Sequence, residues 1–219
     1  MKGERLIILA AGTGTRLMPL TENKPKAMVP FHGKPLLHWQ IQAAHEAGIR
    51  DIVLVGGYHS EMLEQFGLPV VRNERFAETN MVASLWCARE WFGDGFVMAY
   101  CDIVYNPEVL GALLASSDDI SVVVDREWKS YWQLRMSDVL QDAESLEIDE
   151  SGRITSIGQK VSDIALIQGQ YIGMVAFRGA GLKNVCRLVE EEKELNLKGT
   201  TRIHPVKSLD KIYMTDLLQ

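Results

Sequence analysis

The stretch of sequence best suited to chemistry is a glycine-rich segment followed by an arginine and a lysine. It reads LAAGTGTR from Leu9 to Arg16, and KPKAM follows from Lys24 to Met28. Glycines let backbone N–H groups approach phosphate oxygens because no Cβ atom obstructs them. Arg16 can bind two phosphate oxygens at once, and Lys26 can place a compact charge on another. The segment therefore predicts a polyphosphate-binding loop.

Two other phosphate-binding loops do not match this spacing. A P-loop requires a lysine directly after its last glycine, and none follows Gly14 in that way. A dinucleotide-binding fingerprint requires a third glycine where Leu17 stands. A plain turn with solvated charges would also contain small residues. The ordered set of Arg16, Pro25 and Lys26 favours the phosphate site over such a turn.

An acidic residue, Asp102, comes shortly after another apolar run, FVMA at residues 96–99. A run of this kind predicts a buried strand, which would deliver Asp102 at its carboxyl end. A carboxylate there suits Mg²⁺, a hard cation that bridges phosphate oxygens. The alternative is a solvated carboxylate, which is common at strand ends.

Residues 9–16 together with Pro25 and Lys26 resemble the signature of the nucleotidyltransferases that act on sugar phosphates and on phosphocholine. The resemblance implies in-line attack of an acceptor phosphate on the α-phosphorus of an NTP, with Mg²⁺ as the cofactor and Asp102 as a metal ligand. Arg16 would bind the outer phosphates, and Lys26 would neutralise charge around the α-phosphorus. The implied nucleotide-binding residues of the loop are Leu9, Ala10, Ala11, Gly12, Gly14 and Thr15.

A second resemblance lies at residues 74–80 (ERFAETN), which look like a segment near the nucleotide base in bacterial phosphocholine cytidylyltransferases. It implies that Thr79 and Asn80 contact the nucleotide. Asn80 is also expected to cap a helix at residues 81–91, and the cap alone is the alternative. Further candidates for the base and ribose pocket follow a neighbouring predicted strand: Gly57 and Tyr58.

An aromatic-rich stretch lies between residues 125 and 135. Aromatic faces attract ammonium groups, and a cage of them is the usual device for binding choline-like ligands. The alternative is that two of the three large aromatic residues, Trp128, Tyr131 and Trp132, anchor a lid to the core. The acceptor-binding residues expected here and in the later segment GQYIG are Trp128, Tyr131, Trp132, Arg135 and Tyr171.

Two late residues are assigned by the resemblance. In the family, a lysine from the β-rich side touches the acceptor phosphate, and Lys160 matches it, with a plain surface lysine as the alternative. Lys160 therefore joins Arg16 and Lys26 as the expected catalytic residues. The family also supplies a second acidic metal ligand late in the chain, for which Asp216 is the candidate. Alternatively this ligand lies beyond Gln219, because related proteins continue with a further strand that bears an acidic pair.

These residues require a scaffold, and the apolar runs predict one. Strands are expected at residues 6–10, 52–55, 69–71, 96–99 and 120–124, and helices near residues 36–47, 61–66, 81–91, 107–116, 181–195 and 214–219. Strand–helix–strand order predicts right-handed crossovers and a parallel sheet. We thus predict an α/β fold with a doubly wound, mostly parallel, Rossmann-like sheet. Strands expected at 145–149, 154–157 and 171–177 would add a small antiparallel insertion on the acceptor side.

Composition limits the remaining choices. The 219 residues are 47% hydrophobic with a formal net charge of −6, which fits one globular domain over residues 1–219 and argues against nucleic-acid binding. The β-rich part, about residues 126–175, would form one wall of the cleft. The three cysteines lack metal-ligand spacing. No apolar stretch is long enough to span a bilayer, so we expect a cytoplasmic protein without membrane insertion. The sequence leaves open whether the protein forms a homodimer.

The resemblance implies an enzyme that joins an NTP, with CTP preferred, to a small phosphorylated amine or alcohol such as phosphocholine and releases pyrophosphate. The aromatic stretch favours such an acceptor over a sugar 1-phosphate used with UTP or dTTP. A non-catalytic nucleotide-binding homologue is the other alternative. The presence of Arg16, Lys26 and Asp102 together disfavours it.

Overall fold

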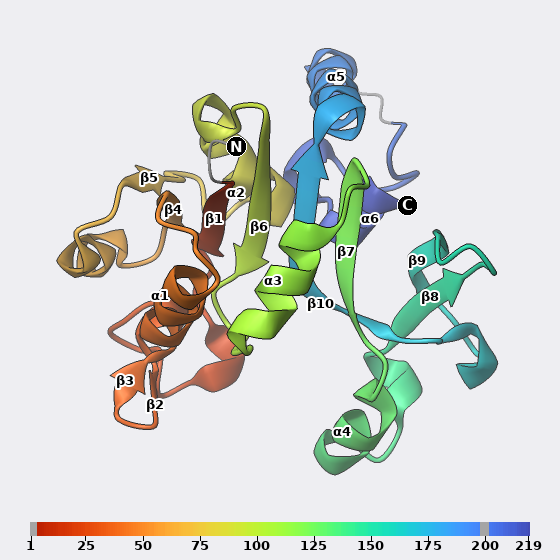
Figure 1. Ribbon diagram of the computed structural model, residues 1–219, viewed down its shortest axis with the longest axis horizontal. Coiled ribbons are helices and arrows are strands. Elements are labelled where there is room, and N and C mark those ends of the chain that lie inside the picture. The colour runs from red at the N-terminus through yellow and green to blue at the C-terminus, as the bar shows by residue number, and fades with distance from the viewer. Residues whose placement is uncertain (1–3, 198–201) are drawn as a thin grey trace.

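The computed structural model, which describes residues 4–197 and 202–219, is built on a six-stranded sheet in the order β5-β4-β1-β6-β10-β7 (Figure 1). The strands are β1 (Arg5–Ala10), β4 (Ile52–Gly56), β5 (Val70–Arg72), β6 (Gly95–Tyr100), β7 (Ile120–Asp125) and β10 (Gln170–Arg178). β1 pairs in parallel with β4 and β6, and β4 pairs in parallel with β5. β10 is antiparallel to both β6 and β7.

Both faces of the sheet are buried because its central strands are apolar on both sides. Successive side chains of a strand point to opposite faces. Ile7 therefore joins one core cluster and Leu6 and Ile8 join the other, all fully buried. The Ile7 face is covered by α2 (Met81–Cys87), α5 (Gly179–Leu197) and α6 (Met214–Leu218), and the other face by α1 (Leu36–Glu46) and α3 (Pro107–Ala115). The predicted doubly wound, mostly parallel fold is confirmed.

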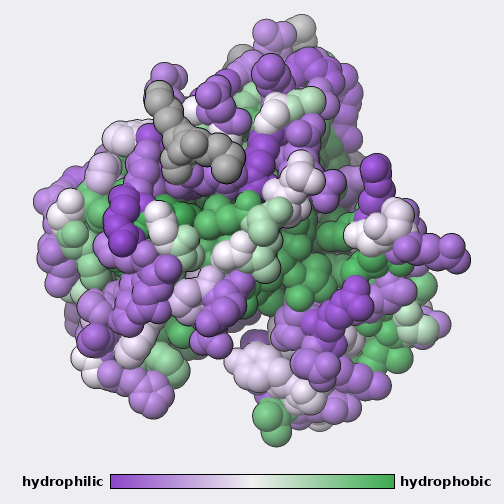
Figure 2. Space-filling model, viewed as in Figure 1, coloured by the Kyte–Doolittle hydropathy of each residue, from purple (hydrophilic) through white to green (hydrophobic). Residues whose placement is uncertain are grey.

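The carboxyl ends of β1, β4, β6 and β7 lie at one edge of the sheet. The first three strands are parallel, and β7 shares their direction because both β6 and β7 are antiparallel to β10. Gly57, Asp102 and helix α4 (Trp128–Arg135) follow strands at this edge. In Figure 2 a notch at the lower edge separates the lobe of β2 (Pro30–Phe31) and β3 (Lys34–Pro35) from the lobe of α4. Ligands of open α/β sheets bind at such an edge.

The β-rich part differs from the prediction. β8 (Glu144–Ile148) and β9 (Ile154–Lys160) form a separate antiparallel hairpin, as expected for these residues. The third expected strand is β10, however, and it joins the central sheet between β6 and β7 instead of extending the insertion. The segment before the hairpin contains α4, an element that the sequence analysis does not predict. The residues expected to form the wall therefore form α4 and the β8–β9 hairpin, and residues 170–175 belong to the central sheet.

Two further elements are shorter or tighter than expected. The helix predicted at residues 61–66 is a 3₁₀ helix at Ser60–Phe66. The helix predicted at 81–91 is α2 followed by a 3₁₀ turn at Arg89–Trp91. None of the helices in the described ranges combines the length and apolarity that crossing a bilayer requires.

Candidate active site

The loop after β1 is folded so that Gly14 lies against Lys26. Gly14 has a φ of 66°, and a Cβ atom there would lie 3.0 Å from Thr21 Cγ2 and 3.1 Å from Lys26 Cβ. Both the conformation and the lack of space therefore favour glycine. The buried hydroxyl of Thr21 donates to the Gly14 carbonyl oxygen at 2.9 Å. This hydrogen bond closes the loop onto the segment that carries Lys26.

Lys26 and Asp102 form a hydrogen-bonded ion pair across the sheet edge. Lys26 begins a 3₁₀ helix at Lys26–Met28, and Asp102 comes soon after β6. Their side chains are 21% and 30% exposed, so both charges border solvent and can reach a ligand. Three predicted site residues, Gly14, Lys26 and Asp102, are thereby brought together.

The other predicted residues of the loop fall into two groups. Gly12, Thr15 and Arg16 are exposed, and a Cβ atom at Gly12 would have no other atom within 4 Å. Leu9, Ala10 and Ala11 are buried. The first group can therefore offer side chains or open backbone to a ligand, whereas the second group can offer only backbone atoms.

Gln40, which the sequence analysis does not single out, supports the turn that carries Asp102. This α1 residue is 1% exposed, and its Nε2 donates to the carbonyl oxygens of Tyr100 at 2.8 Å and Ile103 at 2.6 Å. The N–H of Cys101 donates to the Leu9 carbonyl at 3.1 Å. Cys101 itself is buried, which raises the pKa of its thiol to about 12. The two sides of Asp102 are thus anchored to α1 and to β1.

Gly57 and Tyr58 brace the loop after β1. The Tyr58 N–H donates to the Ala11 carbonyl at 3.2 Å, and the Tyr58 hydroxyl donates to the Glu22 carbonyl at 2.5 Å. A Cβ atom at Gly57 would lie 2.5 Å from Phe76 Cβ. Both residues therefore have a structural reason to be present. Their contact with base or ribose stays a prediction.

Asn80 occupies the N-cap position of α2, but its side chain does not make the predicted capping hydrogen bond. Its amide donates to the Lys211 carbonyl at 2.7 Å instead, and its backbone N–H donates to the Asp210 carbonyl at 2.8 Å. The neighbouring Thr79 accepts a hydrogen bond from buried Asn73 at 2.9 Å. The C-terminal segment thus holds the loop that carries Thr79 and Asn80. Their contact with the nucleotide stays a prediction.

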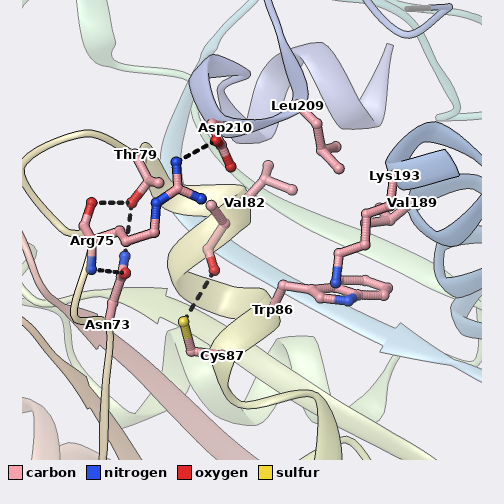
Figure 3. Close-up of a pocket in the computed structure, with 11 residues that line it drawn as sticks. Asn73, Arg75, Thr79, Val82, Trp86, Cys87, Val189, Lys193, Leu209 and Asp210 are labelled. Carbon is pink, nitrogen blue, oxygen red and sulfur yellow. Dashed lines mark hydrogen bonds and ion pairs between the residues drawn. The ribbon is translucent and has the colours of Figure 1, made fainter. Parts of the chain in front are cut away.

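Figure 3 shows a pocket of about 320 Å³ between α2, α5 and the 3₁₀ turn Leu209–Lys211. Arg75 and Asp210 pair across it at 2.7 Å, and the Lys193 ammonium lies 5.3 Å from the centroid of the Trp86 ring. Thr79 is the one predicted nucleotide-binding residue among those that line it, and none of the residues of the glycine-rich loop does. The pocket is therefore separate from the site formed by Gly14, Lys26 and Asp102.

Helix α4 is anchored by Trp128, which is 3% exposed and packs in a small cluster with Val139, Ala143 and Ile167. This corrects the expectation that Trp128 binds the acceptor, because a buried ring presents no face to a ligand. Tyr131, in contrast, is 55% exposed. Trp132 is half-buried and also packs against this cluster, so two of the three aromatic side chains anchor α4.

Tyr171 lies in β10, and Lys160 ends β9. The Tyr171 ring packs edge-on against Tyr100 with centroids 5.9 Å apart, and burial raises the pKa of Tyr171 well above its usual value. Lys160 is exposed at the end of β9, opposite Glu144. Its contact with an acceptor phosphate stays a prediction.

Asp216, the predicted second metal ligand, forms a buried ion pair with Lys207. Its carboxylate, 4% exposed, accepts from Lys207 Nζ at 2.9 and 2.7 Å and from the Tyr213 N–H at 2.6 Å in the first turn of α6. Both oxygens are therefore occupied. Asp216 is therefore a buried, paired carboxylate in this structure, and its role as a metal ligand stays a prediction.

Asp102 fits a magnesium site. In the described part of the chain no group of three or more His, Cys, Asp or Glu side chains is arranged to hold a metal ion. Mg²⁺, however, is commonly held by one or two carboxylates together with substrate phosphates and waters. One carboxylate bordering solvent, next to the loop predicted to bind phosphate, satisfies that requirement.

A glycine-rich loop after β1, a lysine–aspartate pair at the carboxyl edge and a doubly wound sheet define a nucleotidyltransferase. Residues 6–164 match the family model described as the MobA-like NTP transferase domain, and the chain belongs to this family.

Two curated relatives refine the likeness. A CTP:phosphoglutamine cytidylyltransferase of Campylobacter jejuni subsp. jejuni serotype O:2 is 32% identical over 228 aligned residues, which cover 97% of this chain and 86% of that protein. A choline-phosphate cytidylyltransferase of Streptococcus pneumoniae is 42% identical over 98 residues, 43% of each chain. The predicted enzyme class is confirmed: the chain is a nucleotidyltransferase close to the phosphocholine type.

The fold also matches solved structures. The inositol-1-phosphate CTP transferase from T. maritima superposes with a TM-score of 0.74, covering 99% of this chain and 80% of that one at 21% identity. At this identity the likeness concerns the fold alone.

Proposed function

We propose that this nucleotidyltransferase uses CTP and a small phosphorylated amine or alcohol, and that residues 1–219 act as one catalytic domain. The observation that carries the proposal is the set of contacts joining Gly14, Lys26 and Asp102 at the carboxyl edge of the sheet. The two curated relatives, whose names specify cytidylyltransferases, support CTP as the donor.

The reaction requires two anions to meet. An oxygen of the acceptor phosphate forms a bond to the α-phosphorus of CTP, and the bond from that phosphorus to the oxygen bridging the β-phosphate breaks. Pyrophosphate leaves with the bridging oxygen and its electron pair. The acceptor phosphate is itself the nucleophile, so no protein base is needed. The protein's task is to position the reactants and to neutralise charge.

Different residues of this chain position the reactants and neutralise their charge. Backbone N–H groups at Gly12 and Gly14 bind phosphate oxygens, and Arg16 binds the outer phosphates. Lys26 neutralises charge at the α-phosphate, and Lys160 approaches the acceptor phosphate from β9. Asp102 would hold Mg²⁺, which supplies further positive charge to the phosphates.

A pyrophosphate-release assay tests the proposal. The purified chain with MgCl₂ is offered four NTPs against phosphocholine, phosphoethanolamine, 2-aminoethylphosphonate, phosphoglutamine and glucose 1-phosphate, with Lys26→Ala as the control. We expect release with CTP and an amine-bearing acceptor, and its loss in EDTA. Release with UTP or dTTP and glucose 1-phosphate would instead establish the sugar-phosphate reaction. No release with any pair would refute the proposed function.

A further inference from the structure

The Arg135 side chain of helix α4 lies over two aromatic rings of the same helix. The Arg135 guanidinium lies 5.6 Å from the centroid of the Tyr131 ring and 5.2 Å from that of Trp132. Residues three and four apart on a helix are neighbours on one face, so the three side chains form a single cluster. We call it the α4 cluster.

The α4 cluster is held firmly at one end and open at the other. Trp128 lies on the same helical face, is buried, and meets the Trp132 ring edge-on with centroids 6.1 Å apart. Trp132 is half-buried, whereas Tyr131 and Arg135 are exposed. The buried tryptophan therefore fixes the helix while the end bearing Arg135 faces solvent.

Arg135 has no acidic partner. In the described part of the chain no carboxylate forms a hydrogen bond or ion pair with its guanidinium, although nine other Lys or Arg side chains have such a partner. Stacking on aromatic rings uses the faces of a guanidinium and leaves its N–H edge available. That edge presents a fork of donors which matches a carboxylate.

Helix α4 stands at the sheet edge where the acceptor of the proposed reaction would bind. α4 begins shortly after the carboxyl end of β7, at the same sheet edge as Asp102. Its lobe borders the notch in Figure 2, across from the β2–β3 lobe. A ligand whose phosphate lies near Lys26 would therefore extend its far end toward the wall that contains α4.

We propose that Arg135 binds a carboxylate of the acceptor, so that the acceptor is a phosphorylated amino acid or a similar carboxylate-bearing compound. This rests on the proposed function and names its substrate class. A quaternary ammonium would need the ring faces that the guanidinium already covers, and like charges repel. The α4 cluster thus selects against phosphocholine, whereas a carboxylate meets an unpaired cation on a rigid aromatic support.

The decisive comparison uses acceptors that differ by one carboxylate. O-Phosphoserine is phosphoethanolamine with a carboxylate added, and kcat/KM is measured for both, for phosphoglutamine and for phosphocholine. We expect the wild-type chain to prefer the carboxylate-bearing acceptors by roughly 10- to 100-fold, the scale of one charged hydrogen bond. Arg135→Gln should remove this preference through KM with little change in kcat. Arg135→Glu should shift it toward phosphocholine.

Lys129→Gln is the matched control, because Lys129 is an exposed cation on another face of the same helix. It should leave every ratio unchanged. Equal use of O-phosphoserine and phosphoethanolamine, or an equal loss for both in Arg135→Gln, would overturn the assignment and leave the cytidylyltransferase proposal intact. Absence of pyrophosphate release with all acceptors would overturn both.

Discussion

Gly57 and Ala11 approach each other so closely that a Cβ atom at residue 57 would lie 2.6 Å from the Ala11 carbonyl oxygen. The same carbonyl accepts the Tyr58 N–H. The end of β4 and the start of the glycine-rich loop are therefore one packed unit, and the position of the loop depends on a residue far from it in sequence.

Two glycine substitutions separate packing from ligand binding. Gly57→Ala should lower the free energy of unfolding by about 1–3 kcal/mol, because the Ala11 carbonyl and the Phe76 side chain must both move. Gly12→Ala should leave stability nearly unchanged, since its Cβ would meet no other atom, yet raise the KM for the nucleotide. Urea unfolding and steady-state kinetics measure the two effects. Equal effects of both substitutions on KM alone would contradict this account.

Removing either member of the ion pair should stop turnover. We expect Lys26→Ala and Asp102→Ala each to lower kcat at least about 100-fold, the scale of losing a charge contact made in the transition state. Pyrophosphate release at saturating CTP and MgCl₂ is the measurement. Lys34→Ala, at an exposed position of β3, is the control. Near-normal activity in either test variant would remove that residue from its assigned role.

Gln40→Leu should weaken the turn that carries Asp102. The substitution deletes both hydrogen bonds to the carbonyls of Tyr100 and Ile103, and we expect a loss of about 2 kcal/mol in unfolding free energy. The kcat should fall as well, because Asp102 loses its support. Gln42→Leu, at an exposed position of the same helix, should be nearly neutral. If kcat is unchanged, Gln40 stabilises the fold without positioning Asp102.

Asp216→Asn distinguishes a structural carboxylate from a metal ligand. Because Lys207 would lose its charged partner while staying three-quarters buried, stability should fall by about 1–3 kcal/mol. The MgCl₂ concentration for half-maximal activity should stay the same. A shifted Mg²⁺ requirement with unchanged stability would identify Asp216 as a ligand.

Glu144 should make stability depend on pH. Burial is the main cause that raises its pKa above 4.5, so the folded chain keeps this proton to higher pH than the unfolded chain. The resulting stabilisation is present below pH 4.5 and is lost as the pH rises through the folded pKa. Glu144→Gln should therefore flatten the unfolding free energy between about pH 4 and neutrality. Glu150→Gln, in the exposed hairpin turn, serves as the control, and an identical profile for both would contradict the prediction.

The sequence predicts the parallel half of the fold well because its strands are long apolar runs bounded by glycine. The sequence does not show that β10 enters the sheet between β6 and β7, because an apolar run does not indicate which strand it will pair with. Helix α4 does leave a signal, because Trp128, Tyr131, Trp132 and Arg135 recur at helical spacing. The same residues also suit a ligand cage. The sequence analysis interprets them in that way and therefore does not predict the helix.

The residues of the candidate site also divide into those that local sequence signals predict and those that depend on distant contacts. Gly14, Lys26 and Asp102 are predictable from a motif and a strand end, which are local signals. Gln40 is harder to find because its carbonyl partners lie 60 and 63 residues away, although a glutamine on an apolar helical face is itself a signal. The pairing of Asp216 with Lys207 is not predictable, because it depends on the path of the chain between them.

The position of β10 has a consequence for assembly. β7 has β10 as its only neighbour in the six-strand order, so residues 120–125 cannot dock until residues 170–178 are present. The half that contains the glycine loop and Asp102 pairs strands already available by Tyr100. During synthesis the nucleotide half can therefore take shape first. A chain truncated before Gln170 would leave the opposite wall detached.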